Sequence, residues 1–468
     1  MKLRVRPGPV EVPADRRERN PLITPAAYAR LSAIIEHPDA PRWNYTVGDR
    51  VVAEDLVCVE GMRELLRSGG AERAHGLWRE GRPPDAVLAW VDSMRPRVPA
   101  FVRRLEGIDP ARDWARVPTM TREDIAARIE EVVPLDADLE RMIVYDTSGT
   151  TGHAIRVPHH PRAMALNHPL MEHVLERHGV TLAFGPERAA CVNIGAQRDT
   201  VVFATVFAAW GLAPFAKVNF HARVWEPARA RRFLAELEPQ FMTGDPVGFA
   251  EMARWEIAPG PAALLSTAVE LAPAWQRELA ARYGCPVIDT YATTETGPIA
   301  YSAPDGDGMC ILPPDVYVEV VDERGSPARE GEEGEICVTG GRNPYVPLLR
   351  YRTGDRAALA RRGGERRLVD LRARAAVLFR AADGTPLNPV DVGRVIRRWA
   401  IVQHEFRQRA DLSCELVVRE APGLPVDLDA IRDALREVFG PVPRVDVRAD
   451  AALGRGGKVV AFSSEIGA

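Results

Sequence analysis

The sequence predicts an α/β protein, with a large N-terminal part built on mostly parallel sheets and a small α+β unit at the C-terminus. Three observations support this fold class. Short apolar runs alternate with helix-like segments through the middle of the chain, the pattern of strands joined by crossover helices. From residue 315 the pattern changes to strands and turns. After about residue 371, alternating strands and an amphipathic helix predict a separate compact unit.

The N-terminal stretch gives the weakest signal. Residues 1–85 are rich in proline and arginine, and we expect them to be irregular apart from a helical patch at 60–70. Residues 86–130 follow a helical pattern that is interrupted at "RVPTMTREDI". Thr121 precedes an acidic first turn there, which predicts the N-cap of a helix.

The middle of the chain carries the α/β pattern. The predicted strands are 141–145, 189–195, 262–268 and 285–291, and the predicted helices are 228–237 and 272–283. Because parallel strands present their ligand loops at their carboxyl ends, the polar segments that follow two of these strands are candidate ligand loops. These segments are 146–152 and 292–297.

The second half of the chain reads as a β-rich stretch and then a small α+β unit. The predicted strands of the β-rich stretch are 316–322, 336–341 and 348–356. In the small unit, the predicted elements are a strand at 412–418, a helix at 428–439 and a strand at 443–448, before the glycine-rich "LGRGGK".

Composition narrows the possible partners. A chain of 468 residues predicts two or more domains, and 46% hydrophobic with 27% charged residues is typical of soluble globular proteins. The net charge of −4 gives no electrostatic reason to expect nucleic acid or an anionic membrane. The longest apolar run, 201–216, is too short to span a bilayer and is expected in the core. Six dispersed cysteines predict reduced thiols and a cytoplasmic enzyme.

Lysine is scarce although lysine and arginine together number 61. Lysine occurs only at Lys2, Lys217 and Lys458. A lysine that persists in such a background can mark a position where a guanidinium cannot replace a compact ammonium. A biased genome is the alternative explanation, and composition alone does not choose between them.

The loop at 147–152 is suited to phosphate, although it lacks the lysine of a P-loop. It offers four hydroxyl groups, and its glycines allow backbone N–H groups to approach an oxyanion closely. The residues are Thr147, Ser148, Gly149, Thr150, Thr151 and Gly152. The alternative interpretation is an ordinary turn.

Two further segments carry chemistry. Tyr291 follows a predicted strand and could stack on a flat heterocycle, while Glu295, with Thr294 beside it, could hold Mg²⁺. Asp355 in "YRTGD" could accept the hydroxyls of a ribose. Taken singly, these segments are equally compatible with a capped strand end and a common turn.

Together the motifs resemble the adenylate-forming superfamily, which includes acyl-CoA synthetases, luciferases and adenylation domains. The shared motifs are "TSGTTG", "YATTETG", "YRTGD" and a lysine near the C-terminus. The resemblance is closer to the phenylacetate–CoA ligase branch, through "VPTMTREDI", "VYVEVVDERG", "GEEGEICVTG" and "VPLLRYRTGD". It covers residues 86–468.

The resemblance implies a domain organisation. Residues 1–371 would form an adenylation domain and residues 372–468 a mobile lid. The implied parts of the adenylation domain are a divergent extension at 1–85, an α/β core at 86–314 and a β subdomain at 315–371.

The resemblance also implies a reaction. A small carboxylic acid, which we expect to be aromatic, attacks the α-phosphate of ATP with Mg²⁺ present, and pyrophosphate leaves. CoA is the expected acceptor of the acyl group, with a carrier-protein thiol or an amine as alternatives. A nucleotide-binding protein that has lost turnover is the rival from another class.

The resemblance assigns roles to individual residues. Loop 147–152 would grip the β- and γ-phosphates, Glu295 would hold Mg²⁺ next to Thr294, and Lys458 would stabilise charge at the α-phosphate and the substrate carboxylate. The remaining implied nucleotide contacts are Tyr291 on adenine with Val269 and Glu270 nearby, and Asp355 on the ribose, assisted by Arg374.

The sequence gives less information about which residues recognise the substrate. Pocket walls are expected from "VNIGAQRD", "FAKVNFH" and "MTGDP". Asp199 or Asp245 could meet an amino group, and Asn219 or His221 a ring hydroxyl; the alternative is that these side chains only bond their own loops. The adjacent His159 and His160 point apart on an extended run, so we interpret them as structural.

Overall fold

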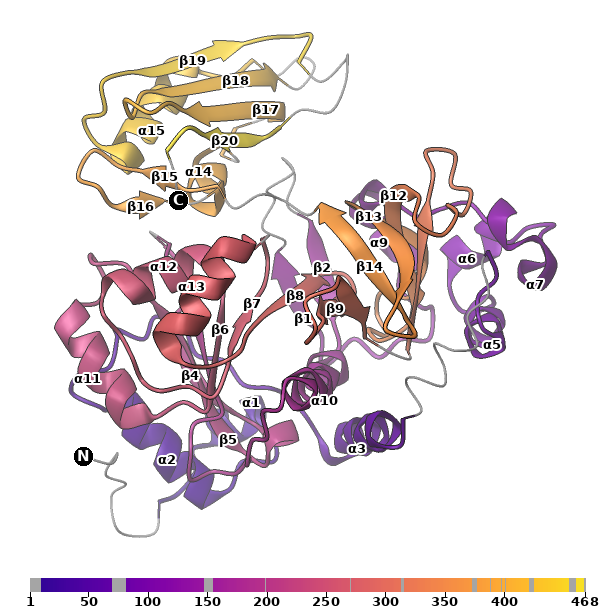
Figure 1. Ribbon diagram of the computed structural model, residues 1–468, viewed down its shortest axis with the longest axis horizontal. Helices are drawn as coiled ribbons and strands as arrows, with labels where there is room; N and C mark the ends of the chain where they lie inside the picture. The colour runs from indigo at the N-terminus through magenta and orange to yellow at the C-terminus, as the bar shows by residue number, and fades with distance from the viewer. Residues whose placement is uncertain are drawn as a thin grey trace.

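One twelve-stranded sheet runs through the larger part of the molecule, and a separate four-stranded sheet lies at the C-terminus (Figure 1). The computed structural model describes residues 10–69, 81–146, 155–197, 199–269, 271–312, 315–372, 377–387, 389–396, 398–399, 401–420, 425–453 and 460–466.

The large sheet changes character along its length. Its strand order is β11-β12-β13-β14-β10-β9-β8-β7-β6-β3-β5-β4. The run from β8 through β7, β6 and β3 to β5 is parallel, and the remaining strands join it antiparallel. The parallel strands and β4 are β3 (Cys191–Gly195), β4 (Phe203–Phe207), β5 (Ala213–Asn219), β6 (Phe241–Gly244), β7 (Leu264–Ser266) and β8 (Val287–Thr293). The others are β9 (Gly297–Ser302), β10 (Met309–Ile311), β11 (Val316–Val321), β12 (Glu333–Gly340), β13 (Leu348–Arg362) and β14 (Glu365–Arg372).

Helices cover both faces of the parallel strands, which confirms the predicted α/β fold. Alternate residues of a strand face opposite sides, and in β3 Val192 packs into one core cluster while Cys191 packs into another. The first cluster takes residues from α2 (Pro25–Ile35), α11 (Pro227–Leu237), α12 (Pro246–Arg254) and α13 (Pro273–Tyr283). The second takes residues from α3 (Ala53–Arg67) and α10 (Pro161–Arg177).

The N-terminal residues are more regular than predicted. They contain α1 (Ala14–Arg19), α2 and an α3 that is longer than the expected patch. The start of α2 has Thr24 as N-cap, accepting a hydrogen bond from the Ala27 amide at 3.3 Å, and a proline at its first position. Leu31 and Ile34 of α2 are fully buried against the sheet, so this stretch is part of the main core.

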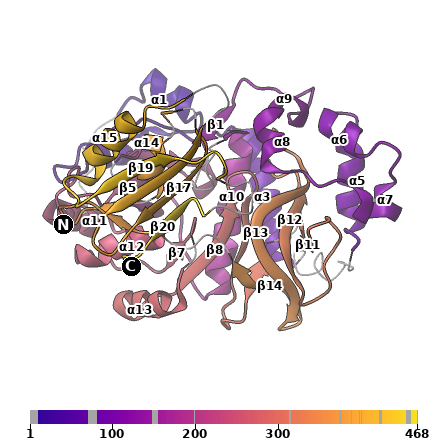
Figure 2. The same ribbon diagram turned by 90° about the horizontal axis from the view of Figure 1, so that it is seen from above.

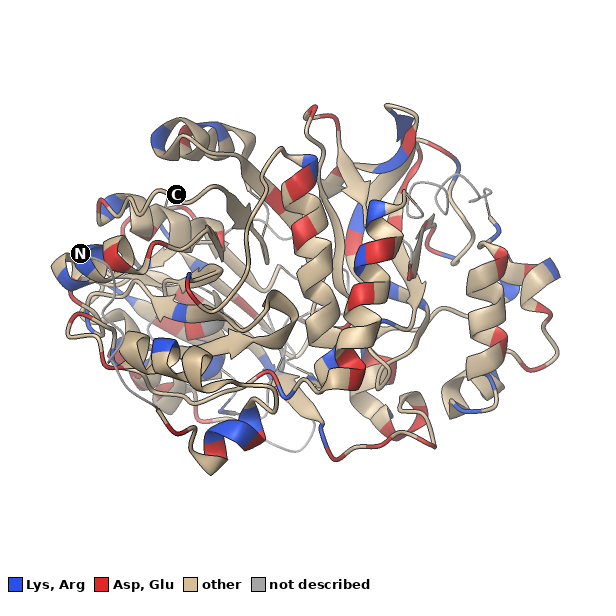
Figure 3. Ribbon diagram, turned by 90° about the horizontal axis from the view of Figure 1, so that it is seen from below, with Lys and Arg blue, Asp and Glu red and all other residues tan. Residues whose placement is uncertain are grey.

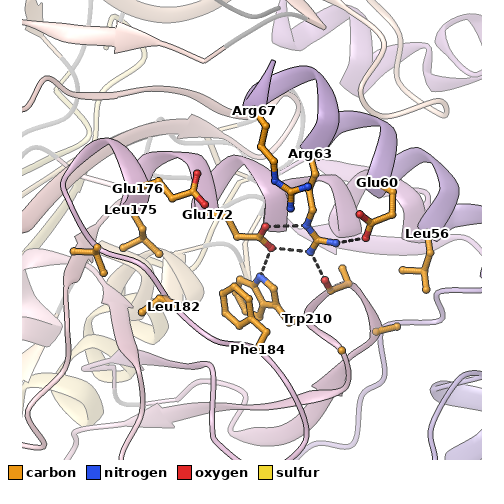
Figure 4. Close-up of a pocket in the computed structure, with 14 residues that line it drawn as sticks. Leu56, Glu60, Arg63, Arg67, Glu172, Leu175, Glu176, Leu182, Phe184 and Trp210 are labelled. Atoms are coloured by element: carbon orange, nitrogen blue, oxygen red, sulfur yellow. Dashed lines mark hydrogen bonds and ion pairs between the residues drawn. The ribbon is translucent and has the colours of Figure 1, made fainter. Parts of the chain in front are cut away.

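Helix α3 is tied to α10 by charge as well as by apolar packing (Figure 4). The Arg63 guanidinium donates to both carboxylate oxygens of Glu172, at 2.7 and 2.8 Å. The same carboxylate accepts a hydrogen bond from the Trp210 indole at 3.0 Å, and the indole stacks on Phe184. These contacts surround a surface pocket of about 460 Å³.

The β-rich end of the large sheet carries its own small helices. They are α5 (Asp85–Met94), α6 (Pro99–Arg104), α7 (Pro110–Asp113), η1 (Trp114–Arg116), α8 (Arg122–Ala127) and α9 (Ile129–Val132). Thr121 is the N-cap of α8, as predicted, in a capping box with Asp124. The apolar run 201–216 forms β4, the 3₁₀ helix η2 (Ala208–Trp210) and the first part of β5. Most of its side chains are buried, as predicted.

The C-terminal residues form a sheet of order β19-β18-β17-β20 around a separate core. Figures 1 and 2 show this unit above the parallel strands. Leu378 packs with Ala196 and Val247, and Arg223 pairs with Asp383 at 3.2 Å. The boundary at 371/372 and the mobility of the unit stay predictions. The elements are β15 (Phe379–Arg380), β16 (Pro386–Leu387), α14 (Pro389–Ile396), β17 (Ile401–Gln408), β18 (Cys414–Glu420), α15 (Leu428–Phe439), β19 (Val445–Ala449) and β20 (Phe462–Ser464).

Acidic and basic residues are interspersed over the face shown in Figure 3. Within the described part of the chain, no helix is both long and apolar enough to cross a bilayer. All six cysteines are free thiols.

Candidate active site

A cavity of about 510 Å³ opens where β7 and β8 end. Three separated segments meet there: the residues that follow β7, the end of β8 with its turn, and the middle of β13. The carboxyl edge of parallel strands is the expected place for a ligand. Of the predicted site residues, this cavity brings together Val269, Tyr291, Thr294, Glu295 and Asp355.

Tyr291 and Asp355 are in direct contact although 64 residues separate them. The Tyr291 hydroxyl lies 3.0 Å from Asp355 Oδ2 and 3.0 Å from Thr353 Oγ1. The Asp355 amide also donates to Thr353 Oγ1, at 3.2 Å. Tyr291 is buried, so its ring is a rigid support that fixes the Asp355 carboxylate at the cavity wall. The stacking of Tyr291 on adenine stays a prediction.

Glu295 is a buried carboxylate at the floor of the cavity, only 4% exposed. Tyr351, on β13, is hydrogen-bonded to it. Burial and the Glu295 charge raise the pKa of Tyr351 above its usual range, so the phenol keeps its proton and donates. Glu295 Oε1 is buried and has no hydrogen-bond partner among the described residues.

A buried carboxylate oxygen without a partner is costly, and a cation would remove that cost. The described residues contain no group of three or more metal-binding side chains, so a protein cage for a metal is not formed by them. Mg²⁺ commonly binds through one or two carboxylates together with water and substrate phosphates. Glu295 fits that pattern as a single carboxylate that lines the cavity.

The turn that carries Thr294 and Glu295 is held by its neighbours. Thr293 Oγ1 accepts from the Thr296 amide at 3.2 Å and lies 3.0 Å from Thr296 Oγ1. His159 of β2 (Arg156–His159) is hydrogen-bonded to the Thr294 backbone, and its ring lies edge-on to Tyr145. Sequence reasoning called His159 structural; in the fold it supports the site turn from behind.

We expect His159 to make stability fall in mild acid. Burial lowers the pKa of His159 to about 4 from 6.5, so the folded protein holds it neutral. The contribution of neutral His159 to the free energy of unfolding is therefore complete above pH 6.5. It is lost as the pH falls through 4, which lowers the free energy of unfolding by about 3 kcal/mol. Urea unfolding of the wild type and of His159→Phe between pH 7 and 4 measures it. The variant should lose less stability than the wild type over that range; parallel curves would contradict the assignment.

The cavity wall also contains residues to which the sequence assigned no role in the site, Arg122 among them. Arg122, the first residue of α8, lines the cavity and brings a cation to it. It belongs to the "VPTMTREDI" motif, which predicted a helix cap and a family branch but no cation at the site. Next to Val269, Ala268 adopts a φ of 77°, a conformation that is strained for a residue with a side chain.

Nine predicted site residues lie outside the described residues. They are Thr147, Ser148, Gly149, Thr150, Thr151, Gly152, Glu270, Arg374 and Lys458. The surroundings of loop 147–152 correct one expectation. The strand before it, β1 (Ile143–Asp146), pairs antiparallel with β2 in a two-stranded sheet. The loop therefore connects a hairpin, and it does not follow a strand of the parallel sheet.

Two of the four residues proposed for substrate choice bond their own loops. Asp245 is the N-cap of α12 and accepts from the Gly248 amide at 2.6 Å. Asn219 exchanges two hydrogen bonds with the Gln197 backbone, at 2.7 and 3.0 Å. These two side chains fit the alternative interpretation of loop-bonded groups, whereas the roles suggested for Asp199 and His221 stay predictions.

Comparison with known proteins identifies the family. The AMP-binding enzyme family matches residues 99–343, more than half of the chain. The chain belongs to the AMP-binding enzyme family. The matched region contains the turn with Glu295 and the whole parallel part of the sheet.

Curated relatives of this AMP-binding enzyme align only over short stretches. An acetyl-coenzyme A synthetase of Wolinella succinogenes is 38% identical over 77 residues, 15% of this chain and 11% of that protein. An acetyl-coenzyme A synthetase of Thiobacillus denitrificans is 33% identical over 87 residues, 17% of this chain and 13% of that protein. The aligned stretches thus span about an eighth of these relatives.

A solved structure matches over most of the fold. It is 2-hydroxyisobutyryl-CoA ligase in complex with 2-HIB-AMP and CoA, with a TM-score of 0.55 and 18% sequence identity. The match covers 82% of this chain and 91% of that one. At this identity the likeness shows a shared fold, including the combination of a large α/β part and a smaller C-terminal unit.

Proposed function

We propose that this AMP-binding enzyme activates a small carboxylic acid, of aromatic type, as an acyl-AMP with release of pyrophosphate. The observation that carries the proposal is the cavity that joins the Tyr291–Asp355 pair to the unpartnered Glu295 oxygen. One end offers a fixed acceptor for ribose hydroxyls, and the other offers charge for a phosphate-bound cation. A nucleotide triphosphate needs both ends.

The chain's own residues account for binding and orientation. Asp355 would hold the ribose while Tyr291 keeps its carboxylate in place. Glu295 would bind Mg²⁺, which neutralises phosphate charge when bound, and Tyr351 would keep the Glu295 side chain oriented. Arg122 adds positive charge at the cavity wall. Loop 147–152 and Lys458 are proposed to complete the phosphate contacts.

We further propose CoA as the acyl acceptor and the phenylacetate–CoA ligase-like branch as the subtype. The names of the acetyl-coenzyme A synthetases and of 2-hydroxyisobutyryl-CoA ligase support a CoA acceptor. The branch rests on the motifs around Thr121 and Asp355. A carrier-protein thiol or an amine would replace CoA without changing the first step.

Pyrophosphate exchange across a panel of acids tests the first step. Labelled pyrophosphate should enter ATP only when an accepted acid is present, because exchange requires reversible acyl-AMP formation. Release of ADP and phosphate would rule out this chemistry. If ATP binds but no acid of the panel supports exchange, a nucleotide-binding protein without turnover is favoured. Adding CoA, a carrier protein or an amine to an exchanging mixture then identifies the acceptor.

The Glu295→Gln variant tests the cation site. The amide keeps an oxygen for the Tyr351 hydroxyl but removes the charge, so the fold should be retained. We expect the exchange rate to fall about 10- to 100-fold and the Mg²⁺ concentration for half-maximal rate to rise. Glu278→Gln, on the exposed side of α13, is the matched control. An unchanged Mg²⁺ dependence in Glu295→Gln would remove Glu295 from the cation site.

A further inference from the structure

A second cavity, of about 160 Å³, lies between α10 and the face of β3, β4 and β5. Its walls combine aliphatic side chains with several aromatic rings. They include Tyr145, Phe203, Phe207, Trp210 and Phe215. Phe207 and Phe215 lie 4.9 Å apart between ring centroids, so the walls are closely packed.

This cavity adjoins the candidate active site. Asn167 lines it, and a Cβ atom placed on Gly297 would lie 3.1 Å from Asn167 Oδ1. Gly297 is two residues after Glu295 and ends the same turn. Tyr145, on the opposite wall, is in the strand that leads into loop 147–152. A group bound here would therefore have one end next to the Glu295 turn.

The far wall limits the size of an occupant. Trp210 separates this cavity from the surface pocket shown in Figure 4, and it lines both. The indole is held by Glu172 and by Phe184, whose ring lies 5.0 Å away at 9° to it. An engineered cavity of about 150 Å³ with apolar walls binds benzene. A space of 160 Å³ therefore accommodates one six-membered ring, whereas a methyl group would leave it largely empty.

One polar side chain gives the cavity a chemical preference. His168 lines it, is 6% exposed, and has Nδ1 at 2.9 Å from the Ala165 carbonyl oxygen. Burial lowers the pKa of His168 to about 4, so the ring is neutral and its one proton is on Nδ1. With the proton on Nδ1, Nε2 is the nitrogen of the ring that can accept a hydrogen bond.

The Asn167 side chain supplies a second buried hydrogen-bond acceptor. Asn167 Oδ1 is buried and accepts no hydrogen bond from the described residues. By contrast, the Asp49 carboxylate, which also lines the cavity, already accepts from Ala208, Val51 and Asn20. Asn167 Oδ1 and His168 Nε2 are thus acceptors that an occupant with a hydrogen-bond donor would satisfy.

We propose that this cavity receives the acyl group of the substrate, and that this group is a single aromatic ring carrying a phenolic hydroxyl or an amine that donates to His168 Nε2. The inference rests on the proposed function, which it narrows to hydroxy- or amino-substituted monocyclic aryl acids. It assigns the contact with the ring substituent to a histidine on α10, which was not among the four candidates that the sequence suggested.

The test is acid-dependent pyrophosphate exchange with the ring-position isomers of hydroxybenzoate and aminobenzoate, and with benzoate, acetate and a hydroxynaphthoate. In the wild type, the best donor-carrying benzoate should exceed benzoate in kcat/KM by at least about tenfold. His168→Leu should bring that ratio to within about twofold of unity, and His168→Gln, which keeps an acceptor, should retain part of it. His173→Leu, on the same helix outside the cavity, should leave it unchanged.

Calorimetric binding of the same acids separates the two proposals. Binding of a hydroxy- or aminobenzoate that weakens in His168→Leu, without exchange, would support the cavity assignment and reject adenylation. Exchange with acetate or the hydroxynaphthoate but with no monocyclic aryl acid would support adenylation and overturn the cavity assignment. An unchanged hydroxyl preference in a His168 variant whose thermal unfolding matches the wild type would also overturn it. If His168→Leu does not fold, the same kcat/KM ratio is measured in His168→Gln. A ratio below that of the wild type would support the assignment, and an unchanged ratio would overturn it.

Discussion

Lys458→Ala should reduce acyl-AMP formation about 100- to 1000-fold while acyl transfer from supplied acyl-AMP changes little. The proposed ammonium stabilises negative charge that develops between the carboxylate and the α-phosphate, and the loss of one such group typically has this effect. Transfer to a thiol starts from an adenylate that has already formed, so it does not need that charge. Single-turnover measurements of the two half-reactions give the two rates separately.

Two further variants control the lysine experiment. Lys458→Arg keeps the charge, but its planar guanidinium differs in shape from an ammonium, so it should restore only part of the rate. Lys2→Ala removes another of the three lysines and should have no effect. Equal loss of both half-reactions in Lys458→Ala would indicate a misfolded C-terminal unit and would reject a role limited to the first step.

Arg350→Met should lower the free energy of unfolding by about 3 to 5 kcal/mol, because it leaves a buried carboxylate without its charge partner. Arg350 is 1% exposed, and its Nε lies 2.9 Å from Glu319 Oε1. Its other nitrogens donate to the carbonyls of Val117 and Gly325, at 2.7 and 2.6 Å. Glu319 would keep only the Trp114 indole, at 3.1 Å. Urea unfolding followed by tryptophan fluorescence measures the loss.

The double variant Glu319→Leu with Arg350→Met is the matched control. Removing both charges avoids an isolated buried ion, so most of the lost stability should return. Arg82→Met tests an exposed pair with Asp85 and should change the stability by less than about 1 kcal/mol. If Arg350→Met were as stable as Arg82→Met, the buried pair would not support the core.

Local sequence patterns were sufficient for elements whose residues act through their neighbours. The apolar run "CPVIDTY" predicts a strand at 285–291, and β8 occupies Val287–Thr293. Thr121 caps α8 because its partner Asp124 is three residues away. Helix α2 carried the same kind of signal in Thr24 and Pro25, but the surrounding prolines and arginines obscured it.

Long-range contacts could not be predicted in this way. Glu319 lies within a predicted strand, and nothing in the adjacent sequence shows that Arg350 will neutralise it from 31 residues away. The motifs did predict that Tyr291 and Asp355 serve one site, but not that they touch. His159 was interpreted as structural, but its contact with the Thr294 backbone could not be predicted because the two residues are far apart in the sequence.

The attachment of α3 to α10 sets a limit on recombinant fragments of this enzyme. A shortened chain that begins at Pro99, where the family match starts, would discard α3 and with it the apolar side chains of Val59, Met62 and Leu66. The exposed flank of α10 would then present bare hydrocarbon and an uncompensated Glu172 to solvent. Such a fragment would aggregate, so a fragment intended for crystallisation or biocatalysis must keep the N-terminal helices.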